Sequence, residues 1–364
     1  MSQSNLYPSK NSGEEVSHNS SSGAQQQNSL RQKIALSDLK YVQLLYKLIY
    51  TIGNVISRPR YFLVFTFARF NLVRQIFLFW SKLWFTSSET ETTEQESCSL
   101  FPEVDPKKAF QTLRQDGMLL DLNLPTDFLE GLLQYISSQN CYAGGRPDLG
   151  FKIADKAAMD QVFPQPFYVA RYFNVSRDCP QINQLVNDPK LREIASKYIG
   201  KPAHYTGSSL YWTFPIEGKS CDADQQKFRY FHYDIDDVSG LRFCFYLSDV
   251  TIDDGPHICI RGSHIKKSIW HVINFFSRIQ SETELAKIYD EQQFITITGN
   301  SGFGFAEDTF CFHKGNPPVK QPRLFLQLHF AAHNYNQQQV FLDDRDRQTL
   351  KTYPLPATAS NVAG

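Results

Sequence analysis

Two histidines and an aspartate in this chain have the residue types and spacing of a metal site. His232 and Asp234 stand two residues apart in a stretch predicted to be a strand, where residues i and i+2 face the same side. With nine histidines in the chain, one such pair is expected by chance, so alone it predicts an ordinary strand histidine. His313, on a distant strand, supplies a third ligand. Two imidazoles and one carboxylate hold Fe(II) on one face; zinc accepts the same ligands but does no redox chemistry.

An arginine ten residues beyond His313 adds a second chemical function. Arg323 begins the next apolar stretch, and its planar guanidinium can bind a carboxylate through two parallel hydrogen bonds. A 2-oxo acid can chelate the open positions of such an iron site. Arg323 would then anchor the far carboxylate of 2-oxoglutarate. The predicted cofactors are therefore Fe(II), 2-oxoglutarate and O2.

Other polar and aromatic residues are weaker candidates for the site. Tyr211, Trp212 and Tyr230 could face a substrate from neighbouring strands, although core packing explains a single aromatic as well. His264 could line the site or fix its own loop. The remaining strand histidines, His257 and His329, are expected to be structural, because the three ligands already fill the protein's share of the coordination sphere.

The elements that would position these residues lie in one predicted domain, residues 101–345, followed by a C-terminal tail, 346–364. Two helical patterns within residues 105–121 and 125–139 come first, around a short predicted strand, and a third helix follows at 188–200, ended by Gly200. Short apolar or alternating stretches follow at 203–214, 228–234, 241–250, 257–263, 292–299, 308–313 and 323–330. This order predicts a mainly β fold with flanking helices and a double-stranded β-helix, or jelly-roll, core. A long helical insertion at 267–292 is expected to be either a lid or a surface helix.

Two stretches of the chain resemble the signature blocks of the phytanoyl-CoA dioxygenase family of Fe(II)/2-oxoglutarate oxygenases. The first is FHYDIDDVSGLRFCFYLSDVTIDDGPHICIRGSHIKK and the second EDTFCFHKGNPPVKQPRLFLQLHFA, and the resemblance extends over about residues 105–335. It implies that His232, Asp234 and His313 hold iron and that Arg323 binds 2-oxoglutarate. A departure is Glu307, where the family commonly has glycine.

The resemblance implies hydroxylation, since Asp234 fills a position that halogenating relatives leave empty. Three alternatives remain open: a non-catalytic binding module on the same fold, a zinc hydrolase with the same ligands, and an oxygenase of a soluble metabolite.

The first hundred residues predict a different organisation. Residues 1–33 are rich in Ser, Asn, Gln and Gly and are expected to be a disordered tail. Residues 34–86 predict cationic, apolar helices interrupted at Arg58-Pro59-Arg60, with seven lysines and arginines and no Asp or Glu between Lys40 and Ser88. Residues 87–100 predict an acidic linker.

Three readings of the cationic segment stay open: membrane-surface contact through residues 41–86, packing on the domain or on a second subunit, and a membrane span. A span is disfavoured because Arg69, Arg74 and Lys82 interrupt the apolar stretch. Membrane contact would favour a hydrophobic or lipid-like substrate.

Composition excludes other classes of protein. The net charge is zero and the pI is near 7.1, which gives no reason to expect a nucleic-acid partner. The seven cysteines lack any CxxC pattern, as in a reducing compartment, and no apolar stretch follows a basic start. We therefore expect a cytoplasmic protein, or one at the inner membrane surface, that acts on a small molecule.

Overall fold

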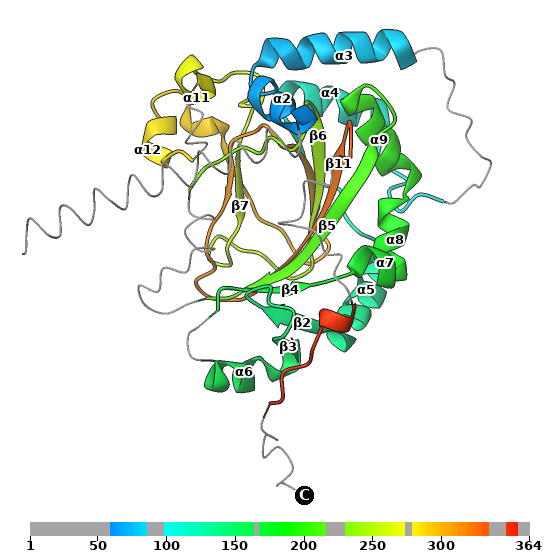
Figure 1. Cartoon of the computed structure of the whole chain (residues 1–364), viewed down its shortest axis with the longest axis vertical. Coiled ribbons are helices and arrows are strands. Elements are labelled where there is room, and N and C mark those ends of the chain that lie inside the picture. Colours follow the sequence, from blue (N-terminus) through cyan, green and yellow to red (C-terminus); the bar gives the residue numbers. More distant parts are fainter. Residues whose placement is uncertain are drawn as a thin grey trace, which may run out of the picture. The chain divides into compact units, whose positions relative to one another are not determined.

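The computed structural model describes residues 59–85, 98–163, 167–215, 230–273, 279–334 and 347–355. Residues from Leu63 onward form one compact unit built on two antiparallel sheets (Figure 1). The larger sheet has the strand order β1-β9-β6-β11-β5-β4-β2-β3, and the smaller has the order β10-β7-β8. This mainly antiparallel architecture with flanking helices is consistent with the predicted jelly roll.

The strands are short, apart from the two longest, which are neighbours in the larger sheet. Their bounds are β1 Met118–Leu119, β2 Asn140–Ala143, β3 Gly150–Lys152, β4 Val169–Tyr172, β5 His204–Thr213, β6 Gly240–Tyr246, β7 His257–Ile260, β8 Phe294–Ile297, β9 Gly304–Asp308, β10 His313–Gly315 and β11 Arg323–Ala331. The strands predicted around β5, β6, β7, β8 and β11 are confirmed.

Strand β11 lies at the centre of the larger sheet, between β5 and β6. All nine of its residues are buried, which explains why RLFLQLHFA is almost continuously apolar instead of alternating. Its first residue, Arg323, pairs with Thr213 of β5, and Phe325 pairs with both Tyr211 and Tyr246. Because side chains alternate across a strand, Arg323 and Phe325 share one face of the sheet.

Helices flank the larger sheet, and α4 and α9 pack on each other (Figure 1). The helices are α2 Pro59–Phe67, α3 Asn71–Phe85, α4 Pro106–Asp116, α5 Thr126–Ser138, α6 Lys156–Val162, α7 Val175–Asp178, α8 Pro180–Val186, α9 Pro189–Ile199, α11 Ile269–Ile273 and α12 Glu282–Leu285. Asp188 caps the start of α9, and Gly200 ends it at φ 83°, which confirms the helix predicted at 188–200.

The smaller sheet is extended by one pair of residues outside its named strands. His232 pairs with His313 of β10 through two backbone hydrogen bonds, and Phe231 pairs with Gln280. The predicted strand at 228–234 is thus reduced to isolated bridges in its described part, 230–234. The predicted strand at 308–313 is also wrong in position: β9 ends at Asp308, residues 309–312 form a turn, and β10 begins at His313.

The region predicted as a long helical insertion contains only short helices in its described part, α11 and α12. The C-terminal residues predicted as a tail are partly fixed against β3. The backbone N–H of Tyr353 donates to the carbonyl of Gly150 at 2.7 Å, and the N–H of Gly150 donates to the carbonyl of Lys351 at 3.0 Å.

The described part of the cationic segment consists of two helices. Pro59 begins α2, in agreement with the predicted interruption, and a break at residues 68–70 separates α2 from α3. None of the described helices is both long enough and apolar enough to cross a membrane. The predictions for residues 1–33, for the first helix at 41–57 and for most of the linker lie outside the described residues.

Arg69 and Arg74 are buried against the domain. A guanidinium N–H of Arg69 donates to the carbonyl of Val272 at 3.2 Å, and Arg74 donates to the carbonyl of His264. For this part of the segment, packing on the domain is therefore the arrangement observed.

Candidate metal centre

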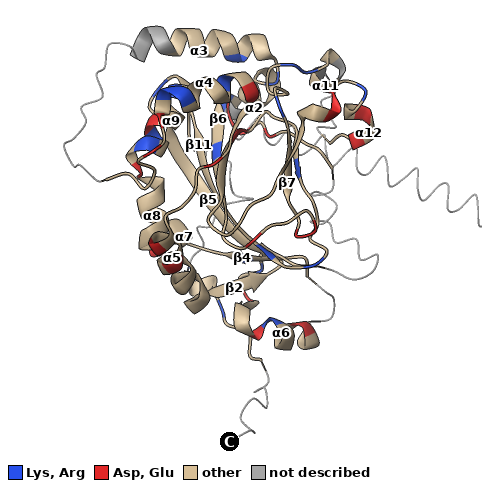
Figure 2. Ribbon diagram, turned by 180° about the vertical axis from the view of Figure 1, so that it is seen from behind, with Lys and Arg blue, Asp and Glu red and all other residues tan. Residues whose placement is uncertain are grey.

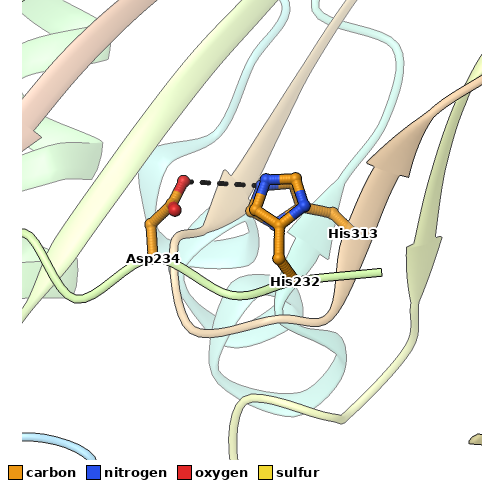
Figure 3. Close-up of side chains that lie close together, drawn as sticks. All are labelled: His232, Asp234 and His313. Carbon is orange, nitrogen blue, oxygen red and sulfur yellow. Dashed lines mark ion pairs between the residues drawn. The ribbon is translucent and has the colours of Figure 1, made fainter. Parts of the chain in front are cut away.

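The three predicted ligands come together at one point of the fold (Figure 3). One ligand atom from each of His232, Asp234 and His313 lies within 4.8 Å of the other two. The backbone pairing of the two histidines, with N–O distances of 2.9 and 2.8 Å, sets their rings 4.5 Å apart between centroids. Asp234 follows in a loop that is held by a 2.8 Å hydrogen bond from its N–H to the carbonyl of Thr309.

The backbone also fixes which nitrogen of each histidine is available. Nδ1 of His232 lies 3.1 Å from the carbonyl oxygen of Tyr230, and Nδ1 of His313 lies 3.0 Å from that of Cys311. A carbonyl only accepts, so each Nδ1 carries the proton and donates it. Each Nε2 is left with a free lone pair, the form in which neutral histidine binds a metal.

The surroundings of the site favour a neutral His232 beside a negatively charged Asp234. Burial, with a further contribution from His313, lowers the pKa of His232 to about 4, so this imidazole is neutral near pH 7. Burial alone would raise the pKa of Asp234, but the charge of Arg242, with smaller contributions from His313 and His232, outweighs burial and holds that pKa well below the usual range. Nε2 of His313 lies 3.6 Å from Oδ2 of Asp234.

Arg242 of β6 is a member of the site that sequence reasoning missed. Its Nη2 lies 2.5 Å from Oδ2 of Asp234 and 3.0 Å from Oδ2 of Asp236, and its Nε donates to Nδ1 of His329 at 3.2 Å. The side chain is buried, so these contacts are shielded from water. The available signal was a single cation inside the apolar stretch GLRFCFY, where a charge needs a partner.

Arg323 is a buried cation with few partners. Its side chain is 1% exposed, and one Nη donates to the carbonyl of Gly255. Its guanidinium lies 5.0 Å from the centroid of the Phe325 ring. Nε has no hydrogen-bond partner, and no carboxylate lies within ion-pair distance, in the part of the chain that the structure describes.

A second missed feature is the pair formed by His257 and Glu307. Nε2 of His257 lies 2.8 Å from Oε2 of Glu307, and the His257 ring stacks on that of His313 at 5.5 Å and 23°. His257 was expected to be structural, and its pairing with Glu307 agrees with that expectation, while its ring also contacts that of the predicted ligand His313. Burial would raise the pKa of Glu307, yet His257 and His313 outweigh burial and lower that pKa to about 2. The pair places a negative charge behind His313.

The weaker candidates are dispersed. Tyr211 packs edge-on against Phe325 at 5.9 Å, on the same interior face as Arg323. Trp212, next along the strand, faces the other way and donates its indole N–H to the hydroxyl of Tyr172 at 3.2 Å.

Tyr230 contributes its carbonyl to His232, while the residue itself is 47% exposed. His264 lies in a separate cluster, with Nε2 3.2 Å from the carbonyl of Arg114.

The donor set fits a divalent iron ion. His232 and His313 would supply Nε2, and Asp234 would supply a carboxylate oxygen, which is a facial set that leaves room for further ligands. The buried guanidinium of Arg323, with its unused Nε, fits a carboxylate ligand such as that of 2-oxoglutarate.

Comparison with known proteins gives distant similarities. No protein-family model matches the chain, and no curated protein matches it. Among solved structures, EctD from S. alaskensis with 2-oxoglutarate and 5-hydroxyectoine is 19% identical, with a TM-score of 0.43 over 70% of this chain and 86% of that chain. SnoN in complex with Fe3+, alpha ketoglutarate and nogalamycin RO is 14% identical, with a TM-score of 0.43 over 66% and 90%.

A further similar structure, EvdMO1, is 14% identical with a TM-score of 0.38 over 62% of this chain, and the chain spans half the length of EvdMO1. The likeness to all three is low, so a function for this chain has to be argued from the residues of its own site.

Proposed function

We propose that this protein is an Fe(II)/2-oxoglutarate-dependent oxygenase. The observation that carries the proposal is Arg323, a buried guanidinium with no carboxylate partner among the described residues, on the interior face that also packs against the metal site. The link runs through Phe325, whose ring lies 6.2 Å from that of His257, which in turn stacks on His313. A zinc hydrolase with the same three ligands would have no use for such a residue.

Each residue of the site has a definite task in this proposal. His232 and His313 present Nε2 because their Nδ1–H groups are held by backbone carbonyls. Arg242 keeps Asp234 charged and oriented, and Arg323 binds the far carboxylate of 2-oxoglutarate. Bound iron supplies the redox chemistry that couples oxidative decarboxylation of 2-oxoglutarate, which releases succinate and CO2, to oxidation of the substrate by O2. The aromatic interior around Phe325 excludes water from these groups.

Hydroxylation is the proposed reaction. Membership of the phytanoyl-CoA dioxygenase family is also proposed, and it rests on the two sequence blocks that contain the proposed metal ligands and Arg323. Asp234 supports hydroxylation, because it occupies the position at which halogenation needs an open site. Similar structures are described as an epimerase, SnoN, and a carbocyclase, SnoK, so likeness of fold does not single out one oxidation.

The proposed substrate is a small, hydrophobic or lipid-like molecule. The support is the outer face of α3, where Leu72, Ile76, Phe79 and Trp80 are all exposed. Such an exposed apolar face is suited to contact with a lipid surface, and a lipid-like substrate would be found at that surface. A soluble metabolite is the alternative substrate, and we expect a cytoplasmic protein in either case.

The test of the proposed function begins with iron. Purified anaerobically, the full chain should bind about one Fe(II), and His232→Ala or His313→Ala should abolish this binding, because two remaining ligands hold a divalent ion weakly. Stoichiometric iron in both variants would exclude this site.

The second part of the test concerns 2-oxoglutarate. Replacing Arg323 with Leu should raise the 2-oxoglutarate concentration needed for half-maximal succinate formation by well over tenfold, since a lost buried charge pair is worth about 2–5 kcal/mol. Iron binding should persist. Arg146→Leu is the control, because Arg146 pairs with Asp148 at an exposed position. Turnover that is independent of 2-oxoglutarate would instead indicate hydrolytic chemistry.

A further inference from the structure

A second cluster of cations lies outside the metal centre. A cavity of about 210 Å³ is lined by the start of α3 and by the segment that follows β7. Its lining includes Arg69, Arg74 and Lys267, together with His264, and none of its lining residues is acidic. Arg69 and Arg74 are both buried. Buried cations are normally paired, so the partners of Arg74 and Lys267 decide whether this cavity carries excess positive charge.

The described residues supply little negative charge to Arg74 and Lys267. Among the described residues, the one carboxylate within ion-pair distance of Arg74 or Lys267 is Asp308, 3.9 Å from Nη1 of Arg74. Asp308 also accepts hydrogen bonds from the hydroxyl of Tyr198 and, at 2.8 Å, from the N–H of Phe310. Lys267 donates to the carbonyl oxygens of Ser263 and Phe310, which satisfy its hydrogen bonds without neutralising its charge.

Two further groups favour an anion at this place. Arg74 is 7% exposed, and its Nε has no hydrogen-bond partner in the described part of the chain. Phe70, Asn71 and Leu72 line the cavity at the beginning of α3, a helix of 15 residues. The first backbone N–H groups of a helix lack partners within it, and the helix dipole is positive at this end. Unused donors, together with one distant carboxylate near two cations, describe a phosphate or carboxylate site.

The rim of the cavity is apolar on both sides. Leu72 is 72% exposed, and it continues into the exposed face of α3 formed by Ile76, Phe79 and Trp80. Ile265 and Ile269 are exposed on the opposite rim. In Figure 2 the described part of α3 is almost free of charged residues. The cations lie inside the cavity and the apolar side chains lie at its rim. This arrangement suits an anionic lipid surface, because the cations can bind the headgroup while the apolar side chains enter the boundary of the acyl chains.

We propose that this cavity binds the phosphate headgroup of an anionic membrane phospholipid, and that the apolar face of α3 inserts beside it. A soluble phosphorylated compound would account for the cations but not for four exposed apolar side chains on one helix face. The inference does not depend on the metal centre, so its failure would leave the proposed oxygenase activity intact.

The sharpest test is an isosteric substitution, Asn71→Asp. Oδ1 of Asn71 already lies 3.5 Å from Nη2 of Arg74, so the new carboxylate would act as an internal counterion at the helix start. The variant should fold at least as stably as the wild type. Its partition onto vesicles containing phosphatidylglycerol should fall by about fivefold, the effect of one charge at an anionic surface. Gln184→Glu, an exposed position on α8, changes the net charge equally and should bind as the wild type does.

A second pair of variants tests the apolar rim. Leu72→Ser should lower the partition by about tenfold, since a large apolar side chain no longer enters the lipid. Val319→Ser is the matched control, because Val319 is also 72% exposed but lies outside this cluster.

Co-sedimentation of the full chain with phosphatidylglycerol vesicles and with phosphatidylcholine vesicles gives the readout. Binding to the anionic vesicles alone, reduced by Asn71→Asp and by Leu72→Ser but not by either control, is the expected result.

Two outcomes would overturn the proposal. In one, vesicle binding is absent or is unaffected by both cavity variants. In the other, inorganic phosphate or glycerol phosphate raises the melting temperature of the wild type but not of Asn71→Asp, while vesicles do not bind, which would identify a soluble phosphorylated ligand instead.

Discussion

Replacing Arg242 with Met should show how much this cation stabilises the metal-free protein by balancing the charges of Asp234 and Asp236. Arg242 lies between Asp234 and Asp236, at 2.5 and 3.0 Å, and is buried. Burial would lower its pKa, but Asp234 and Asp236 outweigh burial and raise the pKa of this guanidinium. Met fills much of the same volume without charge. The substitution therefore leaves two carboxylates near the site without their shared cation.

The size of the effect follows from the burial of the partners. Removing one member of a buried ion pair costs about 3–5 kcal/mol, because the other charge stays buried. The side chain of Asp234 is 18% exposed and that of Asp236 is 30% exposed, so water screens part of the loss and we expect about 3 kcal/mol. At about 2–4 °C per kcal/mol for a domain of this size, the metal-free variant should melt about 6–12 °C lower than the wild type.

A divalent ion should reverse part of this loss. Any ligand that binds only the folded state stabilises it, by about 2.7 kcal/mol at 100 times its Kd. In the wild type Arg242 already neutralises Oδ2 of Asp234, whereas in Arg242→Met the metal alone would do so. Thermal unfolding with and without Mn(II) should therefore show a larger metal-induced rise in the variant. Arg146→Met, which breaks the exposed pair with Asp148, should change the melting temperature by about 2 °C or less in both conditions.

Two results would refute this reasoning. If metal-free Arg242→Met melts within about 2 °C of the wild type, Arg242 does not balance the buried carboxylates. If Mn(II) raises both melting temperatures equally, Arg242 and the metal do not share Asp234.

Two further predictions concern His264 and Lys267, which line the cation-rich cavity, and the residues next to them. Gly117→Ala should destabilise the protein more than Gly262→Ala: both glycines have φ 75°, but a Cβ at Gly117 would lie 2.4 Å from Cys311 Sγ and from His264 Nδ1, whereas nothing lies within 4 Å at Gly262. Equal melting temperatures would contradict the close packing. Vesicle binding should weaken between pH 6 and pH 8.5, because burial and then Arg74 lower the pKa of Lys267 to about 7, so its positive charge is lost as the pH rises. Arg69 and Arg74 keep their charge. His264 loses charge in the same direction, since Cys311 and Asp308 outweigh burial and raise its pKa. Lys267→Met should flatten the pH dependence, and an unchanged dependence would contradict this role.

The sequence singled out the three candidate ligands, which the fold brings together, more clearly than it did their surroundings. His232, Asp234 and His313 were identifiable because ligand chemistry restricts residue type and order, and β11 because its apolar run is unbroken. The turn at 309–312 was missed, since Thr, Phe and Cys have the composition of a strand. Two contacts of Asp308 end β9 there: a local hydrogen bond from the N–H of Phe310 and a tertiary one from the hydroxyl of Tyr198, which is 110 positions away in the sequence.

The break between α2 and α3 was missed for a similar reason. Residues 68–70 are Ala, Arg and Phe, which are compatible with a continuous helix, and neither Gly nor Pro marks the break. The side chain of Arg69 instead donates to the carbonyls of Phe65 and Val272, at 3.2 Å each. Val272 is 203 positions away in the sequence, so local propensity contains no signal for this contact.

Three buried arginines, Arg242, Arg74 and Arg323, differ in whether a carboxylate of the described residues lies close to the guanidinium. Arg242 has its carboxylates within the chain, at 2.5 and 3.0 Å, and its role is to hold Asp234 in place. Arg74 has one carboxylate at the limit of ion-pair distance, and Arg323 has none among the described residues. A buried guanidinium costs several kcal/mol unless an anion compensates it. Among the described residues Arg323 has no such anion and Arg74 shares a distant one, so a bound ligand is expected to complete the balance at each, and the two arginines mark the two sites proposed for this protein.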